Sequence, residues 1–230
     1  MGEVAMRTTP LTRALMVPYF LEAWQAATGG MPSRSLAELL LALLYVETAN
    51  GASLQNFNWG NLSANPATGG DYWRPPWFDL ERIAAIEDPA KRARMESLHA
   101  QMLAKKAPEA FRAYGSHEQG AASFVALLLR PKMQPLLAAA ETGDAVRFAH
   151  AVHSTAYCPD EACKNAGPTY DRVRAEMRAA NILPGGAVPA TTTGAGSSSK
   201  KSSGGAVLVT AVMAGISGYL LWRRYKKATT

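Results

Sequence analysis

The stretch that decides the fold is residues 35–62, SLAELLLALLYVETANGASLQNFNWGNL. Its first half has apolar side chains on every face of a helix, as expected for a helix at the centre of a core. These side chains are Leu36, Leu39, Leu40, Leu41, Leu43, Leu44 and Val46. Ser35 and Glu38 have the spacing of a capping box, which predicts that the helix begins there. Asn50 and Gly51 tolerate left-handed backbone and therefore predict its end.

Glu47 is a carboxylate in the last turn of this apolar helix. We expect desolvation by the leucines and the negative end of the helix dipole to raise its pKa. Glycoside cleavage requires such a group, because a carboxylic acid that stays protonated near neutral pH can serve as a general acid. The alternative is a frayed helix end that leaves the carboxylate in water, where charged groups usually lie.

The segment after this helix is rich in amides, which hydrogen-bond sugar hydroxyls, and in aromatic rings, which stack on pyranose rings. The pattern VETANG followed by NFNWGNL resembles the E-S-G-W-G … N-N-L-F-G-I pattern of bacterial glucosaminidases in the lysozyme superfamily. These enzymes form glycoside hydrolase family seventy-three. The resemblance implies that Asn58, Trp59 and Asn61 bind substrate. Thr48 and Ala49 depart from it, because they replace the usual small residue and tryptophan after the glutamate.

A second segment with the same resemblance is residues 111–129, FRAYGSHEQGAASFVALLL. It is similar to the F-R-x-Y-x-S segment of the family and to the helix that follows. Ser116 and Gln119 form a capping box at the start of this helix. Phe111, Arg112 and Tyr114 are expected to have structural roles here.

A third segment is residues 155–177, TAYCPDEACKNAGPTYDRVRAEM, which is similar to the family's Y-A-T-D-P-x-Y-A-x-K-I. Tyr157 and Asp160 match the first tyrosine and the acid, and Tyr170 matches the second tyrosine. An insertion that carries both cysteines separates the two tyrosines. Which tyrosine reaches the cleft is therefore left open.

The two cysteines, Cys158 and Cys163, lie five residues apart. We expect them to be close in space and to join as a disulfide in an oxidising compartment. The alternatives are two free thiols, or a zinc site with His150 and His153, whose ligand types suit that metal. The spacing matches no established zinc pattern. We therefore expect neither a metal nor another cofactor.

The remaining pattern predicts a mainly α domain. Further helices are expected over residues 11–27, 88–106, 116–129, 135–140 and 143–154. In the first of these helices Leu15, Phe20 and Trp24 are candidate core residues, and Pro18 bends or restarts the helix. In the second, Met95, Leu98, Met102 and Leu103 form the apolar face.

Residues 65–83, NPATGGDYWRPPWFDLERI, contain prolines, glycines and aromatic rings. They predict an extended loop or a short hairpin. Tyr72, Trp73 and Trp77 are expected to line a cleft wall and to bind substrate there. The alternative is an aromatic lid packed on the core.

Charge is placed unevenly along the 230 residues. Six of the 24 Lys and Arg residues lie at position 200 or beyond, and no acidic residue lies beyond Glu176. The remaining 18 basic residues equal the 18 acidic ones, so the net charge of +6 belongs to the tail. This distribution argues against nucleic-acid binding by the folded part.

The composition changes at Pro184. Residues 1–183 are expected to form the domain, and residues 184–205 a Gly-, Ser- and Thr-rich linker. Residues 206–222, AVLVTAVMAGISGYLLW, are uncharged and would span about 25 Å as a helix, slightly less than the ~30 Å hydrocarbon core. They predict a transmembrane helix, because a core helix has no domain left to bury it and a surface helix needs a polar face. Residues 223–230 form a basic tail.

The residues around this span predict its orientation. No apolar run long enough for a secretory signal precedes Pro18. The positive-inside rule then places the basic tail in the cytoplasm and the domain towards the wall. Two pairs of small residues, Ala211 with Gly215 and Ala214 with Gly218, could let two such helices pack as a weak homodimer. This layout would suit a bacteriophage lysis or entry protein, anchored in the inner membrane or a virion membrane.

The resemblance covers about residues 36–177 and implies a lysozyme-like domain with a loop or hairpin lobe. The implied reaction is hydrolysis of the β-1,4 bond after N-acetylglucosamine in peptidoglycan, with Glu47 as the general acid. By position, Glu81 best matches the family's second carboxylate, and Asp79 comes next.

Other mechanisms and functions stay open on the sequence. A substrate-assisted mechanism would use Tyr157 or Tyr170 in place of a second carboxylate. A muramidase or a lytic transglycosylase could use the same fold with Glu47. The last alternatives are an inactive glycan-binding module and a membrane scaffold with no role in sugar binding.

Overall fold

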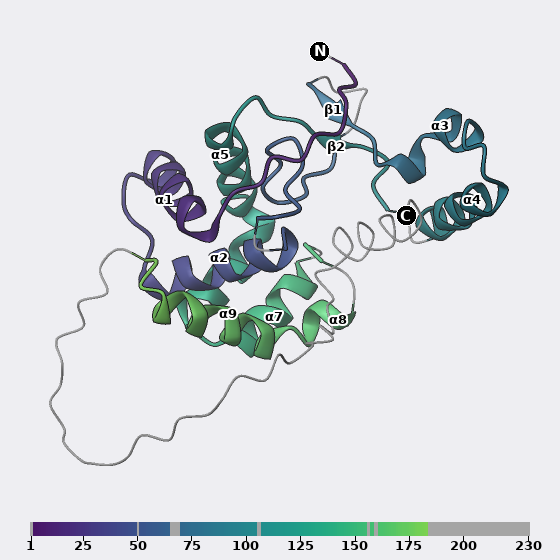
Figure 1. Cartoon of the computed structure of the whole chain (residues 1–230). Coiled ribbons are helices and arrows are strands. Elements are labelled where there is room, and N and C mark those ends of the chain that lie inside the picture. Colours follow the sequence, from purple (N-terminus) through teal and green to yellow (C-terminus); the bar gives the residue numbers. More distant parts are fainter. Residues whose placement is uncertain are drawn as a thin grey trace, which may run out of the picture.

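The structure is a computed structural model that describes residues 2–49, 51–64, 70–104, 107–155, 157–158 and 161–183 (Figure 1). The chain is mainly helical, as the sequence predicted. The α-helices are α1 (Arg13–Thr28), α2 (Arg34–Glu47), α3 (Leu80–Ala84), α4 (Pro89–Ala104), α5 (His117–Leu128), α6 (Gln134–Glu141), α7 (Ala145–Ser154), α8 (Glu161–Lys164) and α9 (Gly167–Ala179). The 3₁₀ turns are η2 (Pro76–Phe78) and η3 (Pro131–Met133), and the strands are β1 (Tyr72–Trp73) and β2 (Phe111–Arg112).

Helix α2 lies at the centre of the larger of two units, packed against α9, α6 and α1 (Figure 1). Every side chain from Leu39 to Leu44 is fully buried, which confirms the helix predicted to be apolar on all faces. Burying one leucine side chain stabilises the fold by about 2 kcal/mol. This helix therefore holds the core together and fixes the position of Glu47 at its end.

The ends of α2 differ from the prediction. The helix begins after Ser33, whose hydroxyl accepts a hydrogen bond from the Leu36 N–H at 3.2 Å. The capping box predicted at Ser35 was wrong, because Glu38 is fully buried and paired with arginines instead. The helix ends at Glu47 and not at Gly51.

Two other side-chain predictions were wrong. Leu15 and Leu103, expected in apolar faces, are 53% and 49% exposed. Phe20 and Trp24 are buried as predicted. Pro18 lies inside α1 without ending it.

A small lobe, residues 76–104, is inserted between the two strands of a hairpin. The strands pair antiparallel, with Tyr72 opposite Arg112 and Trp73 opposite Phe111. The lobe has its own apolar core, made of Trp77, Phe78, Ile83, Met95, Leu98 and Met102. Figure 1 shows α3 and α4 standing apart from α2. Strand β1 lies in the segment predicted to form a loop or a short hairpin, but its partner β2 lies outside that segment, so a hairpin within residues 65–83 was wrong.

The first residues of the chain tie the hairpin to the loop that follows α2. The Val4 N–H donates to the Tyr72 carbonyl at 2.8 Å, and the Asn56 N–H donates to the Arg7 carbonyl at 2.8 Å. The Asn56 amide in turn donates to the Ala5 carbonyl. Residues 2–9 thus join the hairpin to residues 51–64.

Among the residues that the structure describes, no helix is both long and apolar enough to cross a bilayer. The span predicted at residues 206–222, with the linker and the tail on either side, lies outside the described residues.

Candidate functional site

The last residue of α2, Glu47, is 8% exposed. The Asn61 amide donates a hydrogen bond to its Oε2 at 3.3 Å and lies 3.4 Å from its backbone carbonyl. Burial raises the pKa of Glu47 to about 8, although the hydrogen bond from Asn61 acts to lower it. The carboxyl is therefore protonated at neutral pH, as the apolar pattern of its helix predicted.

Two tyrosines complete a cluster with Glu47 and Asn61. Tyr170, on α9, is fully buried and its ring lies 5.3 Å from that of Phe148. The Tyr157 hydroxyl donates to the Gly60 carbonyl at 3.4 Å. Burial raises the pKa of both phenols, and the nearby charge of Glu47 raises them further. The structure thus brings both tyrosines close to the acid, and both stay neutral.

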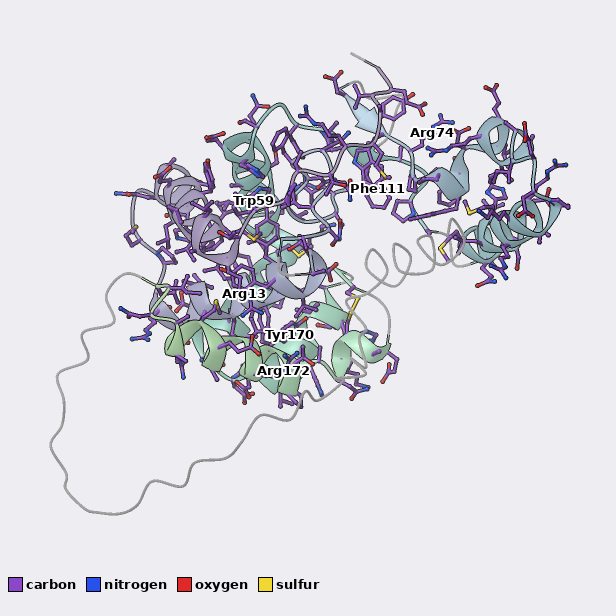
Figure 2. The ribbon with its side chains drawn as sticks, in the orientation of Figure 1. Arg13, Trp59, Arg74, Phe111, Tyr170 and Arg172 are labelled. Carbon is purple, nitrogen blue, oxygen red and sulfur yellow. A yellow bond between two sulfur atoms is a disulfide. The ribbon has the colours of Figure 1, made fainter. Side chains whose placement is uncertain are left out.

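The Tyr170 hydroxyl is buried and has no hydrogen-bond partner among the described residues. Buried polar groups are nearly always paired in native proteins, and the exceptions concentrate where a ligand or water binds. We call Glu47, Asn61, Tyr157 and Tyr170 the Glu47 cluster. Figure 2 shows Tyr170 within the larger unit.

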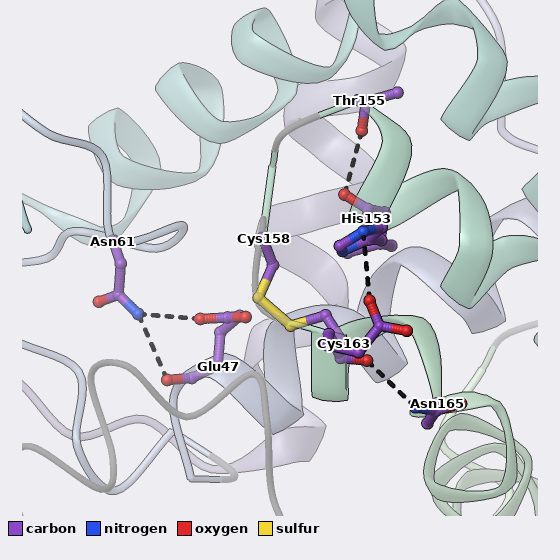
Figure 3. Close-up of a disulfide and its surroundings, with 9 residues drawn as sticks. Glu47, Asn61, His153, Thr155, Cys158, Cys163 and Asn165 are labelled. Carbon is purple, nitrogen blue, oxygen red and sulfur yellow. Dashed lines mark hydrogen bonds and ion pairs between the residues drawn. A yellow bond between two sulfur atoms is a disulfide. The ribbon is translucent and has the colours of Figure 1, made fainter. Parts of the chain in front are cut away.

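A disulfide joins Cys158 and Cys163, whose Cα atoms are 6.1 Å apart. This confirms the expected proximity and pairing. In Figure 3 the Glu47 carboxylate lies between Asn61 and the bridge. The bond occupies both sulfur atoms that the alternative zinc site would need. Within the described residues, no three His, Cys, Asp or Glu side chains are grouped to hold a metal.

The loop beside Glu47 has a strained backbone. Ala49, Asn56, Phe57 and Asn61 all have positive φ angles, between 45° and 55°. Asparagine tolerates this region, but alanine and phenylalanine adopt it at a cost of about 1 kcal/mol or more each. Such strain concentrates at functional sites. Positive φ angles could be predicted from the sequence at Asn56 and Asn61, but not at Ala49 or Phe57.

Asn58 and Trp59, both predicted to bind substrate, are buried and shape this loop. Trp59, which Figure 2 places in the larger unit, is fully buried, and its Nε1–H donates to His117 Nδ1 at 3.4 Å. The Asn58 side chain closes a turn, because it accepts from the Leu62 N–H at 2.8 Å and donates to the Leu62 carbonyl at 2.9 Å. Among the three loop residues predicted to bind substrate, Asn61 is the one that reaches the acid.

The aromatic residues predicted for a cleft wall lie in the hairpin and the small lobe. Trp73 is buried and stacks on Phe111, with ring centroids 5.1 Å apart. Trp77 belongs to the core of the small lobe. Tyr72 is half-buried, with the Arg74 guanidinium 5.9 Å from its ring. The two tryptophans therefore pack within the hairpin and the small lobe.

The carboxylates proposed to assist Glu47 also lie in the small lobe. Glu81 is exposed on α3. Asp79 caps that helix by accepting a hydrogen bond from the Arg82 N–H at 2.9 Å. Figure 1 shows α3 well separated from the end of α2, so the structure does not bring either carboxylate to the Glu47 cluster.

No protein-family model, no curated protein and no solved structure matches this chain. Its function is therefore inferred from the Glu47 cluster and from the sequence motifs that surround it.

Proposed function

We propose that this protein is a membrane-anchored peptidoglycan hydrolase that cleaves the glycan strand, of the β-N-acetylglucosaminidase type. The observation that carries the proposal is the buried carboxyl of Glu47, whose pKa is raised to about 8. A general acid works best when its pKa lies near the operating pH. Glu47 meets that condition at the end of a helix that is buried from Leu36 onward.

In the proposed reaction, Glu47 donates its proton to the oxygen of the leaving sugar. The Asn61 amide already donates to Glu47 Oε2, so it stabilises the carboxylate that forms as the proton leaves. Tyr157 and Tyr170 are neutral phenols beside this carboxyl and can hydrogen-bond the reacting sugar or a water molecule. The strained loop keeps Asn61 in place.

One observation favours a mechanism with a single carboxylate. The influences on the pKa of Glu47 are burial and Asn61, and Glu81 and Asp79 are not in the cluster. An inverting hydrolase needs a second carboxylate about 6.5–9.5 Å away. The sugar's own acetamido group could act as the nucleophile instead. A lytic transglycosylase, which forms an anhydro sugar with one acid, is the second candidate function.

The test is Glu47→Gln in the full chain, assayed in detergent on purified peptidoglycan. Glutamine keeps the shape and accepts from Asn61, but it cannot give up a proton. We expect the rate to fall at least ~10²-fold with the fold intact. A variant with the wild-type rate would overturn the assignment.

Mass analysis of the wild-type products then separates the chemistries. A new reducing N-acetylglucosamine end would support the glucosaminidase. A reducing N-acetylmuramic acid end would indicate a muramidase, and an anhydro sugar would indicate the lytic transglycosylase. Binding without any cleavage would indicate an inactive glycan-binding module.

A further inference from the structure

We propose that the Cys158–Cys163 disulfide is a redox switch that positions Tyr157 beside Glu47. Resting on the function proposed above, this switch makes the hydrolase fully active when the bridge is closed. The hydrolase is impaired when the bridge is reduced. The cysteines are positioning residues in this proposal, because they act through Tyr157.

The bridge lies where it can control Tyr157. Helix α7 ends at Ser154 and α8 begins at Glu161, so Tyr157 and Cys158 belong to the connection between them. The disulfide ties the residue next to Tyr157 to Cys163, a fully buried residue of α8. An anchor one residue away leaves the Tyr157 backbone little freedom.

Two hydrogen bonds of Tyr157 and Cys158 are long. The Cys158 N–H donates to the Val152 carbonyl at 3.3 Å, and the Tyr157 hydroxyl donates to the Gly60 carbonyl at 3.4 Å. Both exceed the usual 2.7–3.2 Å and 2.5–3.0 Å ranges for such bonds. The covalent bridge is therefore a stronger restraint on Tyr157 than either of these two hydrogen bonds.

Tyr157 occupies a fitted position. A Cβ atom on Gly60 would lie 3.3 Å from the Tyr157 hydroxyl and 2.6 Å from the Phe124 ring, so there is no space at this point for a side chain. The Tyr157 hydroxyl donates to the Gly60 carbonyl, and the next residue, Asn61, donates to the Glu47 carboxyl, so Tyr157 and Glu47 bind adjacent residues of one loop. Displacement of Tyr157 would admit water to Glu47 and remove a neutral donor from the cluster.

The redox step is thiol–disulfide exchange. A dithiol such as dithiothreitol gives two electrons and two protons to the bridge, which yields two protein thiols and the oxidised cyclic disulfide. In the reverse direction, one protein thiolate attacks oxidised glutathione, which forms a mixed disulfide and releases one glutathione thiolate. The second cysteine thiolate then attacks the protein sulfur of the mixed disulfide, which closes the bridge and releases the second glutathione thiolate. Because the cytoplasm keeps thiols reduced, the switch would restrain the enzyme until it reaches an oxidising compartment.

The experiment compares the full chain in detergent with the bridge closed, reduced by dithiothreitol, and closed again by oxidised glutathione. We expect reduction to lower kcat on purified peptidoglycan at least ~10-fold, since small displacements of reacting groups cost this much or more. KM should change little, and reoxidation should restore kcat. Tyr157→Phe should have a low kcat that no longer responds to reduction, because the two changes act through one contact.

Glu161→Gln is the matched control. Glu161 lies on the same short helix and pairs with Lys164 at 3.0 Å, but the substitution leaves the bridge intact. It should keep the wild-type response to reduction.

Three results would overturn the proposal. One is an unchanged kcat after reduction. Another is a loss of helical circular dichroism on reduction, which would show that the bridge stabilises the whole domain and does not act on Tyr157 alone. If no form cleaves peptidoglycan, the proposed function fails, and the switch is judged by ¹³C NMR titration of the Glu47 carboxyl, assigned with Glu47→Gln. We expect its pKa to lie near 8 with the bridge closed and lower after reduction, and an equal pKa would refute the switch.

Discussion

Glu47 is harder to ionise in the folded protein than in the unfolded chain, since burial raises its pKa from 4.5 to about 8. Below pH 4.5 the carboxyl is protonated in both states and has no effect on the pH dependence of stability. Between these two values the unfolded chain releases a proton that the folded protein keeps. Its contribution to stability is therefore lost as the pH rises from 4.5 to about 8.

This linkage predicts that Glu47→Gln stabilises the fold at pH 8 while it abolishes activity. The difference in the free energy of unfolding should reach a few kcal/mol, at most about 5, because each pKa unit corresponds to about 1.4 kcal/mol. At pH 4 it should be close to zero. Urea unfolding at both pH values measures it, with Glu22→Gln on the exposed face of α1 as the control. Equal stabilities at pH 8 would contradict the raised pKa.

A second prediction concerns Asn61→Gly. Asn61 donates to the Glu47 carboxyl and acts to lower its pKa, so removing the amide should raise the pKa further. Glycine accepts the φ of +48° at this position. The alkaline limb of kcat/KM should move to higher pH, and the maximal rate should fall because the carboxylate loses a stabilising donor. A limb that moves to lower pH would contradict this account.

The burial of Glu47 could be predicted from the leucines, because a helix that is apolar on every face leaves its last turn in the core. The burial of Trp59 could not. A loop has no periodicity to say which way a side chain points, and Trp59 is enclosed by a contact with His117, which lies 58 residues later.

At the level of helices, a buried ion-pair network joins α2 to α9. Glu38 is fully buried and bonds Arg34 at 3.0 Å, Arg174 at 3.3 Å and Arg178. Burial acts to raise the pKa of Glu38, but hydrogen bonds from Arg178 and Arg34 and the charges of Arg178 and Arg174 together lower it. Its contribution to stability is therefore present above the unfolded pKa and lost as the pH falls through the folded value.

We predict that Glu38→Gln destabilises the domain by about 3 kcal/mol at pH 7. Removing one partner of a buried ion pair costs about this much. Arg174, which is 7% exposed, would then rely on the exposed Asp171, 3.1 Å away, as its ionic partner. Thermal unfolding against Glu22→Gln, the same substitution at an exposed position, isolates the effect. A melting temperature equal to that of the control would show that the network contributes nothing.

This network also explains why the start of α2 was misplaced. The spacing of Ser35 and Glu38 matches a capping box, but Glu38 is bound by arginines 136 and 140 residues later. A local motif cannot reveal partners at that separation. The capping box at Ser116 has no such competitor, and there the hydroxyl accepts from the Gln119 N–H as predicted.

At the scale of the whole molecule, we predict that the uncharged stretch 206–222 anchors the protein in a bilayer. The full chain should float with liposomes in a density gradient, and a chain ending at residue 183 should not. Val212→Lys with Ile216→Lys should abolish flotation, because each charge costs about 3 kcal/mol at the centre of a spanning helix. Val212→Leu with Ile216→Leu is the matched control. A lysine variant that still floats would contradict the anchor.

The mainly helical character and most helix positions followed from periodicity. The small lobe did not, because its core draws on Trp77 and Phe78 from a proline-rich turn and on Met95 from a helix that reads as mostly polar. Neither segment carries enough apolar pattern alone to reveal that the two form one packed unit.

The hairpin makes the small lobe an insertion whose two ends lie next to each other. The chain leaves at Trp73 and returns at Phe111, which are directly opposite partners in the sheet, with Cα atoms about 5 Å apart. A tight two-residue turn such as Asn-Gly can bridge that gap. The excursion can therefore be excised, or exchanged for a foreign module, without moving either end of the scaffold that holds it.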